Sequence, residues 1–177
     1  ATQVGLGVKP SHSYSFLLIG SPSEKYFSVS GGVKVMIERQ FHRAVAHGGT
    51  GSVKTGGNYS ASLLSDRKIK ELGFHQSLWL DSETSKHIEE MTGMNFFAVV
   101  RGQLITPALN GSILPGITRD SILYLAKELG VSCMETAIDI DQLVEQIKSG
   151  DCSECFLSGT AAGITSVRLL GEKGGTV

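Results

Sequence analysis

Two stretches in the second half of the chain repeat apolar residues at the spacing of an amphipathic helix. Residues 122–129 and 140–147 each place apolar side chains at positions i, i+3, i+4 and i+7, which form one helix face. Gly130 and Gly150 follow directly, and glycine is the usual residue after a helix C-terminus. A strand-like run, 132–138, separates the two stretches. Helices that alternate with strands predict a mixed α/β domain.

The rest of the chain reads mainly as short strands bounded by Gly or Pro, with one further helix over residues 59–72 that ends at Gly73. The predicted strands, besides 132–138, are 13–19, 33–39, 77–80, 88–90, 95–100, 103–106, 155–158 and 163–169, with a short extended piece at 25–27. Arg101-Gly102 suits a hairpin, and Asp139 and Gln142 have the spacing of a capping box. The glycine fingerprint of dinucleotide-binding folds is absent.

Length and charge narrow the function classes. A chain of 177 residues suggests one domain, 1–177, with a sizeable core. A net charge of −1 gives no indication of nucleic acid or an anionic membrane as a partner. No apolar run is long enough to cross a bilayer, and no signal peptide is evident, so we expect a cytoplasmic protein, with a mitochondrial one as the alternative. Because the sequence starts without Met, we expect a piece of a longer protein.

The chain has three cysteines, Cys133, Cys152 and Cys155. An odd, low number favours a reducing compartment over a disulfide scaffold. Cys152 and Cys155 have C-x-x-C spacing, but a metal site would need further ligands nearby in sequence, and none is grouped there. A redox pair is one alternative. We favour two incidental cysteines at a helix-to-strand junction.

A glycine-rich stretch, Gly48–Tyr59, holds a single lysine, Lys54. Glycines let the backbone approach another group closely, and a lysine held there could form a Schiff base if its pKa were lowered. Spacing alone favours the simpler alternative, a surface loop with a solvated amine.

Two later stretches suit an anion. Thr118 stands where a helix N-cap belongs, and the free N–H groups of the first turn would face a negative charge. Ser158–Ala162 offers hydroxyl groups and small residues after a strand, either as a second anion contact or as a tight bend. A plain N-cap without a ligand is the commoner case.

Together these stretches resemble the branched-chain amino acid aminotransferases, which are pyridoxal-phosphate enzymes of fold type IV. The matching runs follow the family's order over nearly the whole chain: Gly48–Gly51, Lys54, Gly56–Tyr59, Leu78–Asp81, Glu89–Asn95, Thr106-Pro107, Gly111–Arg119 and Ser158–Ala162. The resemblance implies the large domain of the D-amino acid aminotransferase-like fold, an α/β (mixed α+β) pseudo-barrel of strands with surrounding helices. It also implies that a small N-terminal domain and the extreme C-terminus of the parent are missing here.

The resemblance also implies roles for single residues. Lys54 is similar to the lysine that holds pyridoxal 5′-phosphate and moves the substrate proton. Glu90 resembles the carboxylate that keeps the pyridine nitrogen protonated. Tyr59 is similar to the tyrosine that binds the cofactor's phenolic oxygen, and Leu114 to a residue packed on the ring. Arg43 matches an arginine near the cofactor.

The remaining expected contacts lie around the phosphate and the substrate. By resemblance, the amides of Ile117 and Thr118 and the hydroxyl of Thr160 hold the phosphate, and amides near Thr160 and Ala161 face the substrate carboxylate. Tyr26 resembles a wall of the side-chain pocket, with a core tyrosine as the alternative. Thr92-Gly93 reverses the order common in the family, so a threonine contact to the substrate is not expected there.

The function implied is transfer of the amino group of leucine, isoleucine or valine to 2-oxoglutarate, with amino acids and 2-oxo acids as small-molecule partners and a homodimer in the parent. Two alternatives stay open. One is a D-amino acid aminotransferase or aminodeoxychorismate lyase of the same fold, and the other is a non-catalytic fragment.

Overall fold

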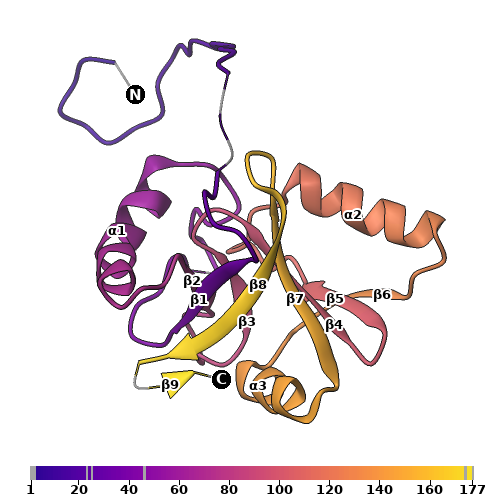
Figure 1. Cartoon of the computed structure of the whole chain (residues 1–177). Helices are drawn as coiled ribbons and strands as arrows, with labels where there is room; N and C mark the ends of the chain where they lie inside the picture. Colours follow the sequence, from indigo (N-terminus) through magenta and orange to yellow (C-terminus); the bar gives the residue numbers. More distant parts are fainter. Residues whose placement is uncertain (1–2, 23, 25, 46, 174, 177) are drawn as a thin grey trace.

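The computed structural model describes residues 3–22, 24, 26–45, 47–173 and 175–176. The regular elements of the described residues begin with β1 and consist of strands with three helices between them (Figure 1). In chain order they are β1 (Val33–Glu38), α1 (Gly56–Glu71), β2 (Gln76–Leu80), β3 (Ile88–Met91), β4 (Asn95–Val100), β5 (Gln103–Pro107), α2 (Ile117–Glu128), β6 (Cys133–Thr136), α3 (Ile140–Ser149), β7 (Cys152–Gly159), β8 (Gly163–Glu172) and β9 (Gly175–Thr176). Among the described residues, no helix is both long enough and apolar enough to pass through a bilayer.

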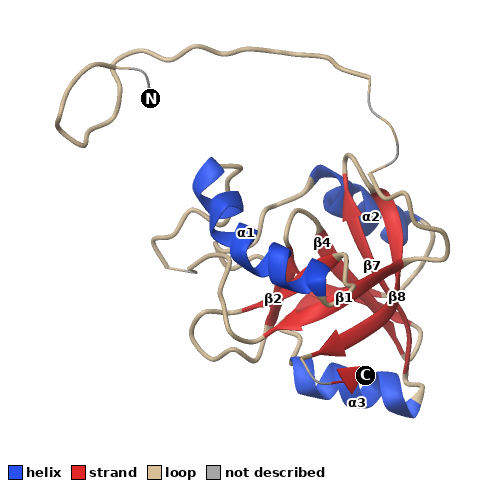
Figure 2. Cartoon of the chain, turned by 60° about the vertical axis from the view of Figure 1, so that its left-hand side comes forward, coloured by secondary structure: helices blue, strands red, loops and turns tan. Residues whose placement is uncertain are grey.

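Six strands close into a barrel in the order β3-β2-β1-β8-β7-β4, because β4 pairs back onto β3. The closing contact is narrow: Glu90 of β3 lies opposite Asn95 of β4. β5 and β6 extend the sheet beyond β4, and β9 adds to β8. The barrel is mixed, since β1 runs parallel to β2 and β8 while the other pairs of the barrel are antiparallel. This closed barrel with helices around it confirms the predicted architecture (Figures 1 and 2).

Apolar side chains fill the barrel. β1 is buried along nearly its whole length, as parallel strands with both faces covered usually are. Within the barrel core, the largest fully buried side chains come from most of the barrel strands and from α3: Ile37, Leu78, Leu80, Met91, Phe96, Ile140, Leu143 and Leu157. A second, smaller cluster forms outside the barrel, where α2 packs on Phe97 and Leu104 through Ala126.

Both ends of α3 and the end of α1 follow the signals in the sequence. Asp139 caps α3 by accepting hydrogen bonds from the N–H groups of Asp141 (2.9 Å) and Gln142 (3.0 Å). Gly150 ends α3 in the left-handed region, with φ 83°, and Gly73 follows α1 with φ 81°. These capping and stop signals are therefore confirmed.

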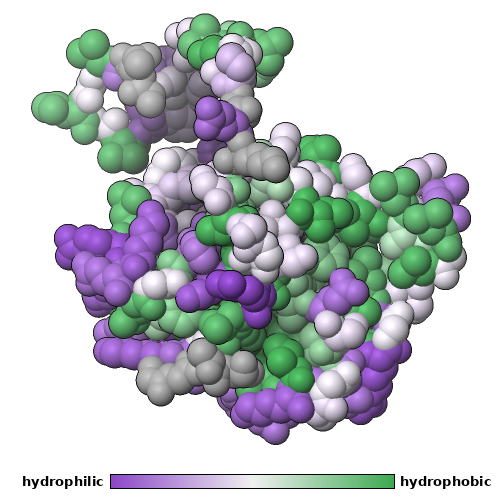
Figure 3. All heavy atoms as spheres, in the orientation of Figure 1, coloured by the Kyte–Doolittle hydropathy of each residue, from purple (hydrophilic) through white to green (hydrophobic). Residues whose placement is uncertain are grey.

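The predicted strand at 13–19 is wrong. Residues 3–32 contain no strand where they are described, and Figures 1 and 2 show the first part of this segment, residues 3–22, standing away from the barrel. Phe16 is 91% exposed and Leu18 is 90% exposed, so the apolar side chains that suggested a buried strand pack on nothing in the described chain (Figure 3). In the predicted extended piece at 25–27, Lys25 lies outside the described residues, and Phe27 lies in no strand but packs against the barrel core.

The glycine-rich loop before α1 is pinned at its base. Asn58 donates hydrogen bonds from Nδ2 to the carbonyls of Thr50 (2.7 Å) and Val53 (2.9 Å). The loop also lies directly on the chain at residue 112: a Cβ atom at Gly51 would stand 2.1 Å from the carbonyl oxygen of Ser112. Glycine is thus required at 51 because of this backbone contact. In contrast, a Cβ atom at Gly57 would meet nothing within 4 Å.

The connection between β2 and β3 is organised by one carboxylate. Asp81 accepts hydrogen bonds from the backbone N–H groups of Glu83, Thr84, Lys86 and His87 and from the Thr84 hydroxyl. Burial alone would raise the pKa of Asp81, but the hydrogen bonds from His87 and Thr84 outweigh it and hold that pKa well below its usual range.

We expect Gly51→Ala to destabilise the protein by about 2 kcal/mol or more, because the new methyl group meets a backbone atom that cannot rotate away. Gly57→Ala, in the first turn of α1 directly after the loop, is the control, and the higher helix propensity of alanine should leave stability unchanged or raise it by up to about 1 kcal/mol. Urea unfolding midpoints measure both. Equal effects of the two substitutions would contradict the close contact at residue 51.

We expect Asp81→Asn to lower the free energy of unfolding at pH 7 by about 1–3 kcal/mol, since it weakens several hydrogen bonds to a buried charge. A carboxyl group with a lowered folded-state pKa stabilises the protein above its unfolded pKa, and this contribution is lost as pH falls. The difference between wild type and Asp81→Asn should therefore shrink below about pH 4. Glu83→Gln, in the same turn, is the control, and a pH-independent difference for Asp81→Asn would refute this account.

Candidate functional site

A cavity of about 170 Å³ lies beside the seam where β3 closes onto β4. It is bordered by the loop before α1, the first turn of α2 and the end of β7. Its lining consists of Lys54, Glu90, Gly93, Met94, Asn95, Leu114, Pro115, Gly116, Ile117, Thr118, Ser158, Gly159 and Thr160. Six predicted site residues thus share one cavity: Lys54, Glu90, Leu114, Ile117, Thr118 and Thr160. A larger cavity of about 650 Å³ between β1 and α1 is lined by none of them. The residue types that line the cavity, and not its volume, therefore identify the site.

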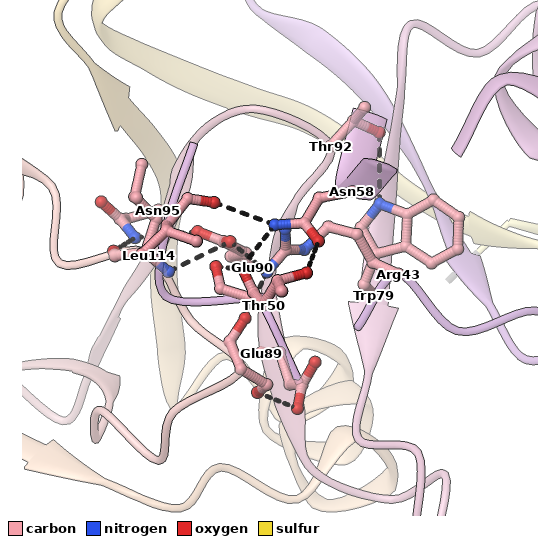
Figure 4. Close-up of polar contacts among 12 residues, drawn as sticks. Arg43, Thr50, Asn58, Trp79, Glu89, Glu90, Thr92, Asn95 and Leu114 are labelled. Atoms are coloured by element: carbon pink, nitrogen blue, oxygen red, sulfur yellow. Dashed lines mark hydrogen bonds and ion pairs between the residues drawn. The ribbon is translucent and has the colours of Figure 1, made fainter. Parts of the chain in front are cut away.

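Glu90 is the buried acid of this cavity. Its Oε1 atom lies 2.6 Å from Nη2 of Arg43, and the N–H of Leu114 donates to it at 3.2 Å. Nδ2 of Asn95 donates to Oε2 at 3.1 Å (Figure 4). Burial raises the pKa of Glu90 to about 7, although Arg43, the Leu114 N–H group and Lys54 each favour the ionised form. Burial and the neighbouring positive charges thus act in opposite directions on this carboxyl group.

Arg43 lies behind Glu90 and outside the cavity lining. Besides its ion pair, Nη2 donates hydrogen bonds to the carbonyl oxygens of Gly51 (3.3 Å) and Ser112. The guanidinium therefore joins β3, which carries Glu90, to the loop before α1, which contains Gly51 and Lys54 (the lysine loop). The sequence placed Arg43 near the cofactor, and the structure places it next to the acid.

Lys54 projects from the loop before α1 and is exposed at the cavity. Tyr59, in the first turns of α1, is half-buried and is not part of the lining. Its ring instead borders the turn between β3 and β4, since a Cβ atom at Gly93 would lie 4.0 Å from Cε1 of Tyr59. The amine comes from the loop and the tyrosine from the helix that follows it, and only the amine lines the cavity.

The start of α2 forms another wall. The N-cap residue is Gly116, so the prediction that Thr118 is the N-cap is wrong, and no side chain caps this helix. Ile117 and Thr118 occupy the first turn beside the cavity, where uncapped N–H groups and the helix dipole favour an anion. A Cβ atom at Gly116 would stand 2.1 Å from Oδ1 of Asn95, so a larger residue there would have to displace the side chain that bridges Glu90 and Leu114.

The end of β7 supplies a hydroxyl group from the predicted stretch Ser158–Ala162, in which the resemblance gave roles only to Thr160 and Ala161. Ser158 is fully buried, lines the cavity, and its Oγ atom has no hydrogen-bond partner among the described residues. A buried hydroxyl group without a partner is uncommon, and it suits a site that receives a polar ligand. Asn95, which joins Glu90 to the carbonyl of Leu114 (2.8 Å), was also without a predicted role.

Thr92 faces away from this chemistry. Its hydroxyl group donates to Oδ1 of Asp66 (3.0 Å) and accepts from Nε1 of Trp79 (3.2 Å), as Figure 4 shows for the tryptophan. Gly93 lines the cavity in its place. The absence of a threonine contact to the substrate at this point stays a prediction.

Two predicted substrate residues lie outside the lining. Tyr26 is 54% exposed on the N-terminal segment, where its ring meets Phe27 edge-on with centroids 4.9 Å apart. Ala161 is exposed in the β7–β8 turn next to Thr160. The substrate roles of both residues stay predictions.

Comparison with known proteins gives consistent matches. A probable branched-chain-amino-acid aminotransferase of Staphylococcus aureus (strain N315) is 49% identical over 175 residues, which cover 96% of this chain and 48% of that protein. The branched-chain amino acid aminotransferase of Escherichia coli superposes with a TM-score of 0.78 at 35% identity, covering 98% of this chain and 55% of that chain. The enzyme from Thermobaculum terrenum, in its PLP form, gives a TM-score of 0.67 at 29% identity over 78% of this chain and 43% of that chain.

The chain spans about half the length of the curated relatives that it matches. The family model described as amino-transferase class IV matches residues 22–170, which include the barrel and every residue of the cavity lining. With the shared cavity of Lys54 and Glu90, this match leads to a plain conclusion: the chain belongs to the class IV aminotransferase family.

Proposed function

We propose that this chain is the cofactor-binding part of a pyridoxal-phosphate aminotransferase that moves the amino group of leucine, isoleucine or valine to 2-oxoglutarate. One observation carries the proposal: an exposed amine, a buried acid and an uncapped helix N-terminus border one cavity. The names of the relatives support the substrate class, and the PLP form of the T. terrenum enzyme supports the cofactor.

The residues present fit this cofactor. Lys54 would hold its aldehyde carbon, and Glu90 would face its ring nitrogen. The N–H groups of Ile117 and Thr118 and the hydroxyl group of Thr160 would hold its phosphate, since an uncapped helix start favours an anion. The unpartnered Oγ atom of Ser158 is a further polar group on the same wall.

The bound cofactor would supply an electron sink for the charge left at the substrate α-carbon. The chain's own residues manage the protons. Lys54 Nζ would accept the proton from the substrate α-carbon and later release it, which an exposed amine at the cavity can do. Ionised Glu90 keeps a proton on the ring nitrogen. Its position against Arg43 holds the carboxylate in place while it does so.

Trapping the cofactor tests this assignment. We expect borohydride reduction of the protein loaded with pyridoxal 5′-phosphate to attach the cofactor covalently to Lys54, because only this described lysine lines the cavity. Peptide mass mapping locates the attachment. Lys54→Ala should abolish it, and Lys70→Ala, which removes an exposed amine from α1, should leave it unchanged. Labelling spread over other lysines, or undiminished in Lys54→Ala, would remove the mechanism.

Amino-donor profiling of the whole protein then tests the substrate class. Leucine, isoleucine and valine should react with 2-oxoglutarate faster than D-alanine, by about tenfold or more in kcat/KM. A preference for D-alanine would favour the D-amino acid aminotransferase alternative while leaving the role of Lys54 intact.

A pH titration of stability tests the state of Glu90. Its raised folded-state pKa, about 7 against 4.5, means that the stabilising contribution is present below pH 4.5 and is lost as pH rises through about 7. Without cofactor, the free energy of unfolding should fall by up to about 3 kcal/mol over that range. Glu90→Gln should flatten the slope in part, because burial also raises the pKa of the neighbouring Glu89.

Glu145→Gln, on the exposed face of α3, is the control and should leave the slope unchanged. Urea unfolding at intervals from pH 4.5 to 8 provides the measurement. A slope in Glu90→Gln equal to that of wild type would mean that Glu90 is already ionised across this range.

A further inference from the structure

The two cysteines at the start of β7 lie in contact. Sγ of Cys152 and Sγ of Cys155 are 3.7 Å apart, although a regular strand would send residues three positions apart to opposite faces. C-x-x-C spacing in a plain strand would therefore keep two thiols apart. The contact needs a local irregularity, and β7 contains one.

A β-bulge at Ser153 brings the thiols to one face. Along β4, Val99 pairs with Glu154 while the next residue, Val100, pairs with Cys152, so β7 carries one extra residue at this point. Ser153 and Glu154 are consecutively exposed, which breaks the alternation of the strand. The bulge reverses the direction of Cys152 relative to the rest of β7.

Packing gives the same result independently. Cys155 and Leu157 pack in the barrel core, and Phe156 between them packs in the outer cluster under α2. Continued alternation would place Cys152 on the side of Phe156. Cys152 lies instead in the barrel core with Cys155. The chain therefore has a dithiol at the start of β7, at the opposite end of this strand from Thr160.

The dithiol is also open to small molecules. A cavity of about 360 Å³ is lined by both cysteines, by Ile147 of α3 and by β8. Cys155 is half-buried at this cavity, and Cys152 is 8% exposed. The third cysteine, Cys133, packs elsewhere, in the outer cluster, and so provides an internal reference.

We propose that Cys152 and Cys155 form a modification site, a dithiol that closes to an intrachain disulfide by exchange with a small-molecule disulfide. In the first step the Cys152 thiolate attacks one sulfur of the small disulfide, whose S–S bond breaks and releases one small thiolate. Cys155 then loses its proton to solvent and attacks Sγ of Cys152, which releases the second small thiolate. Two protein thiols are oxidised, and the small disulfide is reduced to two thiols.

The environment favours this order of attack. The hydrogen bond from Cys155 lowers the pKa of Cys152, while the same contact, together with burial, raises the pKa of Cys155. The thiolate therefore forms first on Cys152, and Cys155 acts as the resolving thiol. The inference depends on these contacts and not on the aminotransferase activity.

Glutathione disulfide, titrated against glutathione, tests the proposal on the 177-residue chain. The intact mass should fall by two hydrogen atoms with no glutathione retained. Glu-C cleavage after Glu154 should leave the two halves joined until a reductant is added. Cys133 should remain open to alkylation, and Cys133→Ser should behave like wild type. Cys155→Ala should stop at a mixed disulfide between Cys152 and glutathione.

A comparison with the unfolded chain separates the folded geometry from the spacing alone. Because the bulge holds the thiols in contact, the native chain should need about tenfold less glutathione disulfide for half-oxidation than the same chain in urea. By linkage, that tenfold preference equals about 1.4 kcal/mol of added stability in the oxidised chain. Equal midpoints in both states, or oxidation that joins Cys133 to either partner, would overturn the proposal.

Discussion

The buried ion pair between Arg43 and Glu90 holds the site together. The two side chains are 4% and 5% exposed and lie 2.6 Å apart. Removing two charges from water costs several kcal/mol per ion, and the mutual attraction offsets this only when further hydrogen bonds complete both groups. Here Nη2 of Arg43 donates to Gly51 and Ser112, while its Nε atom has no partner among the described residues, and Glu90 accepts from Leu114 and Asn95. The pair therefore fixes the relative positions of the lysine loop, β3 and the chain before α2.

The barrel closes at the same place. β3 and β4 meet through Glu90 and Asn95, and the cavity opens beside this short pairing. A longer ladder would satisfy the seam with backbone hydrogen bonds and leave less room for a ligand. The narrow closure leaves Asn95 free to bridge Glu90 and Leu114. Its consequence is a carboxyl group whose pKa burial raises to about 7, and a cationic ring nitrogen at this position would favour the ionised form.

The sequence predicted mainly those features that are set by residues close together in the sequence. The apolar face of α3, the stops at Gly73 and Gly150 and the cap at Asp139 are local, and the structure confirms them. On the predicted face of α2 only Ala126 is buried, while Leu125 and Leu129 are 54% and 77% exposed. Long-range contacts explain the rest. The apolar run at 13–19 predicted a buried strand, but apolar content cannot say which sheet edge a strand will join. The bulge at Ser153, which turns two cysteines that looked incidental into a contact pair, is set by pairing with β4 and is invisible in C-x-x-C spacing.

The loop that carries Lys54 shows the same contrast between local features, which the sequence predicts, and long-range contacts, which it does not. Its glycines predicted a backbone that approaches another group, but not which glycine is needed or what it approaches. Gly51 rests on the carbonyl of Ser112, and Arg43 binds both carbonyls at that point. Lys54, three positions further on, remains exposed. The proposed chemistry requires both features. The fixed start of the loop directs Lys54 to the same cavity in every turnover, and the exposed amine can separate from the cofactor to carry a proton.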